Sequence, residues 1–221
     1  MYKRILLITT IIIVAAILFW HFSAFQETFY KIVIPLEKYF KKNELLGFIL
    51  FIFIAIASAL LSPLTNAPLI PVAVALWGTT ITMILLFGGW IIGDITAYYL
   101  GKQIGRPIIR YIISAERFDK GIEAIRKHTR FYMLLLLRIA LPAELGYAFG
   151  VIRYHFGKYL FLTFLANIPF VFITTYASKA VLDGERLRFF GLLAVLGIIL
   201  FGAMYFARNS QNKKRGLLNQ K

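Results

Sequence analysis

Arg138 stands alone among apolar residues, and it is the residue with the clearest capacity for chemistry. All other residues between positions 134 and 141 are uncharged. A charge at the centre of a membrane helix costs about 2.5–3.5 kcal/mol on insertion scales, so a carboxylate, backbone carbonyls, water or a lipid phosphate must offset it. A guanidinium bonds two phosphate oxygens at once, which favours the phosphate. A purely structural ion pair, or snorkelling toward the inner membrane face, is the alternative.

Two carboxylates share this apolar setting. Asp94 is the only formal charge between residues 45 and 100. A low dielectric disfavours a charged carboxylate, so Asp94 could take up and release a proton, or it could pair with Arg138. Glu144 follows Arg138 by six residues, which puts the two on different faces of a straight helix. A turn at Pro142 could join them, making Glu144 a partner or a proton carrier; a hydrated interfacial position is the equal alternative.

The remaining chemistry-bearing residues form no catalytic or metal-binding pattern. The chain has no cysteine, and its three histidines lack metal-ligand spacing. No Gly-x-Ser-x-Gly elbow or phosphate-binding loop is present. The hydroxyl residues Ser58, Ser62 and Thr65 lack a base that could activate them. The sequence therefore predicts no enzyme, no metal and no cofactor.

The composition predicts a membrane protein. Of the 221 residues, 60% are hydrophobic and only 16% are charged, against about 25% charged in an average soluble domain. A chain of this length cannot bury that much apolar surface in one soluble core. The net charge of +15 comes from basic residues clustered between apolar blocks, which is typical of charges that orient spans and touch anionic lipid. We expect anionic lipid head groups as partners and no nucleic acid.

The apolar blocks predict four full spans and two broken segments. The full spans cover residues 1–26, 79–100, 157–178 and 189–207. The broken segments cover residues 46–77, with prolines at 63, 68 and 71, and residues 131–152, with Pro142. Both arms of the first are shorter than the ~20 residues that a span needs. The connecting segments are an extracytoplasmic amphipathic or solvated connector at 27–44, a basic loop at 101–130 and a basic tail at 208–221.

Counting basic residues indicates that both broken segments are re-entrant hairpins. If both cross the membrane, 9 basic residues lie inside and 15 outside; if both re-enter, 17 lie inside and 7 outside. The positive-inside rule favours the second arrangement, and it also disfavours a single re-entrant segment, which gives 13 against 11. The prediction is an all-α integral membrane protein with both termini in the cytoplasm and two oppositely oriented hairpins. Each hairpin precedes a span, and the two units have opposite orientations in the membrane, as in an inverted repeat.

Small residues recur at every fourth position beside Asp94. They include Gly89, Gly93, Gly101 and Gly105, and Gly146 and Gly150 repeat the spacing in the second hairpin. Such a ladder lets another helix approach closely, so we expect these glycines to pack helices together.

Two stretches of the chain resemble the signatures of the DedA superfamily, also called the SNARE-associated Golgi protein or VTT-domain family. One is GGWIIGDITAYYLGKQIGR at 88–106; the other is LRIALPAELGYAFG at 137–150, followed by Asn-Ile-Pro at 167–169. Both lie within residues 45–178, about the length of a VTT domain. The resemblance implies two opposed re-entrant loops and lipid handling: translocation of undecaprenyl phosphate or phospholipid in bacterial members, scrambling in eukaryotic ones, and an association with proton coupling. By position, Arg138 matches the hairpin arginine and Asp94 the acid of the Gly-Asp motif.

The chain departs from the typical bacterial pattern at two places. Its first hairpin has no glutamate and offers Asn66, Thr65 and prolines instead. Its second hairpin lacks a second arginine after the proline and has Glu144 nearby. In both respects it resembles the other VTT branch more closely.

These patterns together predict a lipid transporter or scramblase of the bacterial inner membrane. The expected substrate contacts are Arg138, Asp94, Glu144, Pro142 and Asn66, with protons and a second copy of the chain as further partners. The alternatives are a proton-coupled secondary transporter of a small solute or ion, and a membrane organiser without transport.

Overall fold

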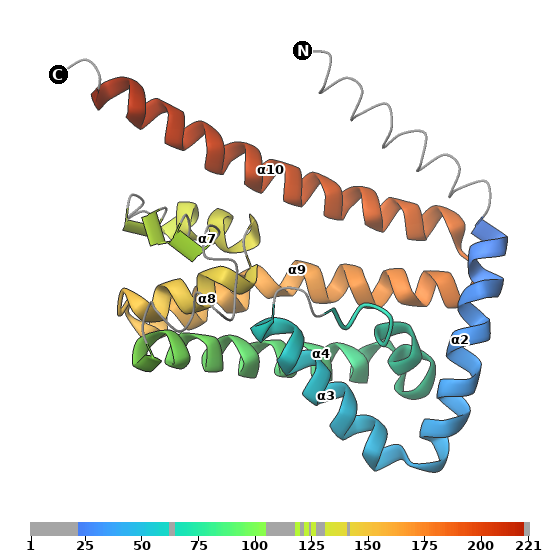
Figure 1. The fold of residues 1–221 in the computed structure, drawn as a ribbon. Helices are drawn as coiled ribbons and strands as arrows, with labels where there is room; N and C mark the ends of the chain where they lie inside the picture. The colour runs from blue at the N-terminus through green and yellow to red at the C-terminus, as the bar shows by residue number, and fades with distance from the viewer. Residues whose placement is uncertain are drawn as a thin grey trace.

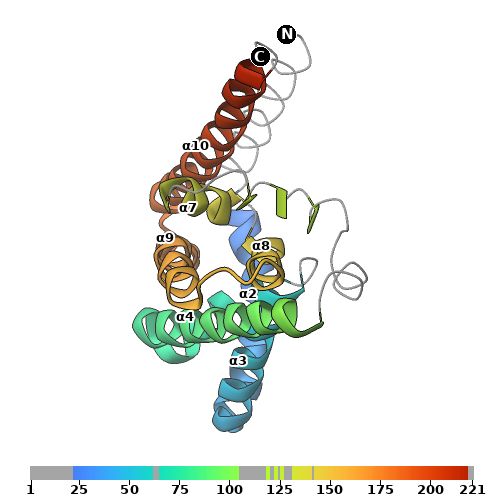
Figure 2. The same ribbon diagram turned by 90° about the vertical axis from the view of Figure 1, so that its left-hand side faces the viewer.

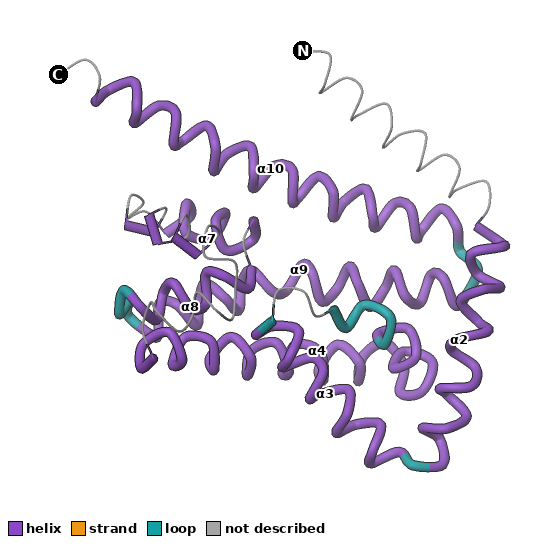
Figure 3. The backbone as a smooth tube through the Cα atoms, viewed as in Figure 1, coloured by secondary structure: helices purple, strands orange, loops and turns teal. Residues whose placement is uncertain are grey.

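The protein is a bundle of α-helices. The computed structural model describes residues 22–61, 65–104, 118–119, 122–123, 125–126, 131–140 and 142–218. Regular structure in these ranges is helical throughout, as the sequence predicts: α2 (Phe22–Lys42), α3 (Glu44–Leu60), α4 (Ile70–Ile104), α7 (Phe131–Ala140), α8 (Pro142–Val151), α9 (Phe156–Leu182) and α10 (Arg186–Leu218). Short described loops join α2 to α3 at residue 43, α8 to α9 at residues 152–155 and α9 to α10 at residues 183–185 (Figure 3).

The long helices form successive layers. In Figure 1, α10 lies over α9 and α9 lies over α4, while α2 crosses the ends of these three helices. Figure 2 shows that α4 crosses α9 at an angle and that α3 projects away from the bundle. At the end of the bundle opposite α2, the short helices α7 and α8 pack against α10 and α4 respectively.

Three of the described helices are long and apolar enough to cross a membrane. They cover Ile70–Ile104, Phe156–Leu182 and Arg186–Ala203, and the spans predicted at 79–100, 157–178 and 189–207 fall on them. The span predicted at 1–26 lies outside the described residues except for its last five, which begin α2. The span count and the cytoplasmic position of the termini therefore stay predictions.

The helices of the two predicted hairpins are short. The 17 residues of α3 rise about 26 Å, and the 10 residues each of α7 and α8 rise about 15 Å. A bilayer core is about 30 Å thick, so none of the three crosses it when straight. These lengths agree with re-entrant hairpins, and the re-entrant path itself stays a prediction.

Helix α4 contains a break that divides it into a short arm and a long span. Gly78 has φ 76° and ψ 168°, a left-handed and non-helical conformation that favours glycine. The break falls between the apolar arm and the span that the sequence predicts as separate units. The predicted hairpin at 46–77 thus comprises α3, the turn around Asn66 and this first arm of α4.

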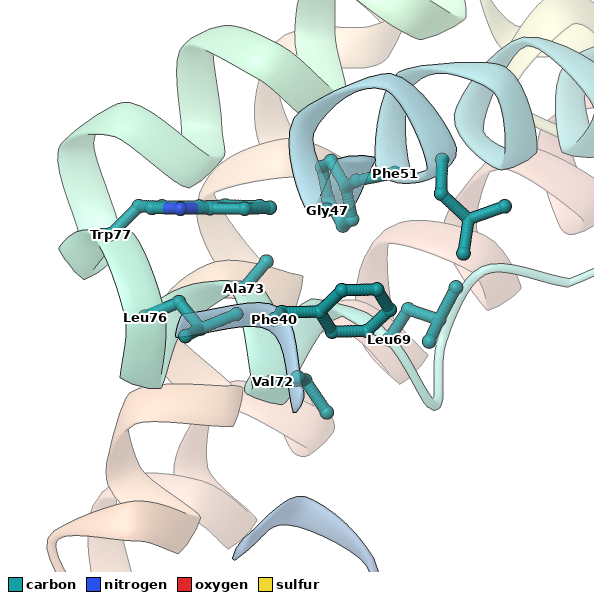
Figure 4. Close-up of a pocket in the computed structure, with 9 residues that line it drawn as sticks. Phe40, Gly47, Phe51, Leu69, Val72, Ala73, Leu76 and Trp77 are labelled. Atoms are coloured by element: carbon teal, nitrogen blue, oxygen red, sulfur yellow. The ribbon is translucent and has the colours of Figure 1, made fainter. Parts of the chain in front are cut away.

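Aromatic packing closes the first hairpin. The rings of Phe48 and Trp77 stack with centroids 4.2 Å apart, and Phe51 meets the same indole edge-on. Figure 4 shows Phe40 of α2 and Leu69 facing the same apolar gap between α2, α3 and α4. The gap measures only about 20 Å³, close to the space of one water, so it is part of the packing and too small for a ligand.

Helix α2 is amphipathic, and its apolar face is covered by protein. Val33 and Phe40 are buried together with Val72 of α4, while the four lysines of α2 stay exposed. The predicted connector at 27–44 is therefore helical up to Lys42, and it anchors the first arm of α4.

The glycine ladder on α4 seats two different helices. An added Cβ would lie 2.7 Å from the Ala59 Cβ at Gly93, and 2.3 Å from the Tyr147 carbonyl oxygen at Gly101. Gly89 faces α3 like Gly93, and Gly146 and Gly150 bring α8 equally close to α4. Gly105, the last glycine of the predicted ladder, lies outside the described residues.

Candidate functional site

The candidate site lies where α4, α7 and α9 meet. Asp94 lies on the buried face of α4, one residue after Gly93, and Arg138 lies in the last turn of α7. The third helix, α9, contributes Thr163 and Asn167 from one buried face. Asp94 and Arg138, which lie 44 positions apart in the chain, thus converge at the junction of these three helices.

Asp94 and Arg138 form an ion pair inside the protein. The Arg138 Nη2 lies 2.5 Å from the Asp94 Oδ1, and the two side chains are only 2% and 3% exposed. Asn167 Nδ2 donates a hydrogen bond of 2.9 Å to the other carboxylate oxygen of Asp94. Arg138 Nε donates a longer bond of 3.4 Å to Thr163 Oγ1. Both oxygens of the carboxylate are therefore satisfied.

Aromatic side chains shield the pair from its surroundings. The Tyr159 hydroxyl donates 2.9 Å to the backbone carbonyl of Asp94. The Tyr159 ring stacks on Tyr98 at 5.0 Å and contacts Phe149 at 5.4 Å. The Tyr98 hydroxyl in turn donates 2.5 Å to the Tyr154 carbonyl oxygen. The site in this conformation is closed.

A closed ion pair of this kind can exchange partners but has little room for other chemistry. The free-energy cost of burying two opposite charges together is reduced because they neutralise each other, whereas removing one partner leaves an uncompensated charge. An anion that reached Arg138 would replace one acceptor with another. Arg138 can therefore serve as an anion-binding residue, and in this conformation the carboxylate of Asp94 occupies it.

The structure brings Arg138 and Asp94 together, which the sequence left open as one of several arrangements. Asn66 lies in the turn between α3 and α4, where its backbone carbonyl accepts from the amides of Leu69 and Ile70. Its side chain is 5% exposed, and its Nδ2 has no hydrogen-bond partner among the described residues. The helix α8 begins at Pro142 and includes Glu144 in its first turn, but these two side chains lie outside the described ones.

Sequence reasoning missed the residues of α9. Thr163 and Asn167 are four residues apart, so they share a helix face, and polar residues at that spacing in an apolar span are a readable signal. Asn167 was part of the family signature without a role attached to it. Tyr159 carried no signal, because an aromatic residue near the end of a span is ordinary.

A hydrogen bond links the two predicted hairpins. The Tyr147 hydroxyl of α8 donates 3.0 Å to the carbonyl of Leu60, the last residue of α3. The final carbonyls of a helix have no partner within the helix, so this bond satisfies one of them. The end of the first hairpin helix is thereby tied to the second hairpin.

A family model described as the VTT domain matches residues 64–180. The match covers more than half of the 221-residue chain and contains α4, α7, α8, the ion pair and nearly all of α9. No curated protein and no solved structure matches the chain.

Proposed function

We propose that this chain, which belongs to the VTT-domain family of DedA and SNARE-associated Golgi proteins, moves lipids across a membrane as a transporter or scramblase. It is an integral membrane protein with at least three helices of spanning length among its described residues. The proposal includes a non-enzymatic role in a bacterial plasma membrane, with lipid phosphates as partners. Protons and a second copy of the chain are further proposed partners.

The buried pair of Asp94 and Arg138 carries the proposal. A desolvated arginine in a spanning bundle is expensive unless it is matched, and Asp94 matches it at 2.5 Å. A lipid phosphate presents paired oxygens much as a carboxylate does, and guanidinium binds both in the same bidentate way. In the proposed step the phosphate displaces Asp94 from Arg138, and Asn167 continues to hold the freed carboxylate.

The other predicted residues are proposed to line the route. Asn66 supports this because its buried Nδ2 is a donor with no partner in the described part of the chain. Buried donors normally find an acceptor, so a passing phosphate or water would satisfy it. Pro142 and Glu144 begin α8, directly after the helix of Arg138, and Glu144 is proposed to carry charge or protons there.

The test uses purified protein in liposomes that carry a head-group-labelled phospholipid. After the outer leaflet is quenched, the wild type is expected to expose the protected half rapidly. Arg138→Ala should slow this by at least about tenfold, because a bond to a charged group contributes roughly 1.5–3 kcal/mol. Arg188→Ala is the matched control, since Arg188 lies in an exposed pair with Glu185.

A second variant separates loss of transport from loss of fold. The double variant Asp94→Asn with Arg138→Gln replaces both charges with amides and leaves no buried charge unpaired. It is expected to insert normally and still fail to move lipid. Wild-type lipid movement by this variant would refute the proposed role of the pair and would favour a membrane organiser.

A proton-coupled transporter of a small solute or ion is the second candidate. The observation that favours it is the carboxylate of Asp94, which lies buried on α4 and is paired with the guanidinium of Arg138. Uptake driven by an imposed pH gradient, with no movement of labelled lipid, would favour this function over the first.

A further inference from the structure

A second polar feature lies at the end of the bundle where α2 crosses it (Figure 1). A cleft of about 360 Å³ opens there between α2, α4 and α9. Its charged lining consists of Glu37, Lys179 and Asp183, and Tyr30 and Thr79 add hydroxyls. A volume of this size falls in the range of small-ligand pockets.

The cleft is separate from the buried ion pair. Both features involve α4, but the cleft borders Gly78 and Thr79, whereas the ion pair uses Asp94. The fifteen residues from Thr79 to Asp94 rise roughly 23 Å along the helix. A ligand of head-group size cannot touch both at once.

The helix break at Gly78 shapes one wall of the cleft. An added Cβ at Gly78 would meet no atom within 4 Å, so the glycine is required by its positive φ and not by crowding. The break redirects α4, and small residues border the cleft on both sides of it: Ala75, Gly78 and Thr79. Because these side chains are short, they leave the space of the cleft unfilled.

Two of the three charged residues that line the cleft have no charged partner in the described part of the chain. Within the described part of the chain, neither Lys179 nor Asp183 forms an ion pair or a side-chain hydrogen bond, although they lie one turn apart on α9. Glu37 is already paired with Lys41 at 2.6 Å. Asp183 also caps the C-terminus of α9, where the helix dipole favours a cation and disfavours a carboxylate. The cleft thus offers a positive pole at Lys179 and a negative pole at Asp183.

The position of the cleft suits a ligand at the membrane surface. The apolar helix α9 ends at Leu182 and the apolar helix α10 begins at Arg186, so the chain turns here between two spanning helices. The end of a span lies near the boundary between hydrocarbon and water. Head groups and dissolved molecules both reach this depth.

We infer that the cleft binds a zwitterionic group that carries a phosphate and an ammonium. Lys179 contacts the phosphate, and Asp183, with Glu37 beside it, contacts the ammonium. A plain anion would face the unpaired carboxylate of Asp183, and a plain cation would leave Lys179 unused. The inference concerns binding alone and does not rest on the proposed lipid movement.

The test measures binding of short-chain phospholipids to the full-length protein in detergent by native mass spectrometry. The two probes share their acyl chains and carry either a phosphoethanolamine or a phosphoglycerol head group. The wild type is expected to prefer the ethanolamine lipid. Lys179→Gln should weaken both lipids by about two- to fivefold, the range of exposed ion pairs. Asp183→Asn should remove the preference without weakening the glycerol lipid.

Matched controls are the exposed residues Lys38 and Glu27 of α2, which do not line the cleft. Lys38→Gln and Glu27→Gln should bind like the wild type. Competition by free phosphoethanolamine would identify a soluble ligand as a source, and its failure would identify a lipid. Equal wild-type binding of both head groups, or unchanged binding by the Lys179 and Asp183 variants, would overturn the inference.

Discussion

At the scale of residues, the balance of charge at Asp94 and Arg138 decides both stability and function. The pair is desolvated on all sides, and Asn167 and Thr163 complete it. A buried ion pair adds little net stability compared with apolar residues of equal volume. Removing one of its partners, however, is strongly destabilising, because the remaining charge is buried without compensation. The ion pair is therefore better explained by a role in binding an anion than by a role in stabilising the fold.

Asp94→Ala should destabilise the protein far more than the double variant Asp94→Asn with Arg138→Gln. The single change leaves Arg138 buried without its counter-charge, at a cost of about 3–5 kcal/mol. The double change leaves only neutral amides. Thermal unfolding in detergent measures both, and the hypothesis of a stabilising pair would be supported instead if the two variants unfolded at the same temperature.

At the scale of elements, α4 is the common support of both predicted hairpins. One part of its small-residue ladder faces α3, and the next part faces α8. The helices α3 and α8 are too short to cross the membrane, and both pack on this surface, whereas α7 packs on α9 and α10. The polar contact from Tyr147 to Leu60 then fixes the distance between α3 and α8.

Gly150→Ala is expected to weaken the docking of α8. An added Cβ there would lie 2.0 Å from the Tyr98 carbonyl oxygen, and backbone cannot move aside cheaply. Overpacking of this kind costs about 1–3 kcal/mol. Gly88→Ala on α4 is the control, because its Cβ meets nothing within 4 Å. Unfolding temperatures should fall for the first and hold or rise for the second; equal behaviour would refute close packing at Gly150.

Tyr147→Phe should loosen the junction of the hairpins without disturbing the core around it. It removes one hydrogen bond, worth about 0.5–1.5 kcal/mol, and keeps the buried ring. We expect a small fall in unfolding temperature together with a changed rate of lipid movement in the liposome assay. As a control, Tyr39→Phe, at an exposed tyrosine of α2, should leave the unfolding temperature nearly unchanged. A transport rate identical to the wild type would separate Tyr147 from the transport path.

At the scale of the whole molecule, the predicted path through the membrane is open to a direct test. The chain has no cysteine, so single cysteines report their own position only. With an impermeant maleimide on intact cells, Lys38→Cys should be labelled, while Lys120→Cys and Asn212→Cys should react only after permeabilisation. Labelling of Lys120→Cys from outside would contradict the two re-entrant hairpins.

The sequence predicted those parts of the molecule in which a residue differs clearly in type from its neighbours in the chain. Arg138 and Asp94 are conspicuous because charges are rare in apolar runs, and prolines marked the turn before Ile70. The choice of Asp94 as the partner of Arg138 required the tertiary packing of α4 against its neighbours. The boundary between the first hairpin and the following span was predicted at residue 78, where the helix breaks. The cleft at Lys179 escaped notice, since charges at helix ends are ordinary features.

The shared ladder on α4 also has a consequence for how the chain is made. Synthesis delivers α3 and α4 in succession, so the upper glycines, Gly89 and Gly93, can be covered as soon as α4 is complete. The surface around Gly101 must wait until α8 emerges about forty residues later, at a ribosomal pace of roughly 5–20 residues per second. For those seconds the surface of α4 around Gly101, which α8 covers in the finished protein, is exposed to the bilayer or to another chain.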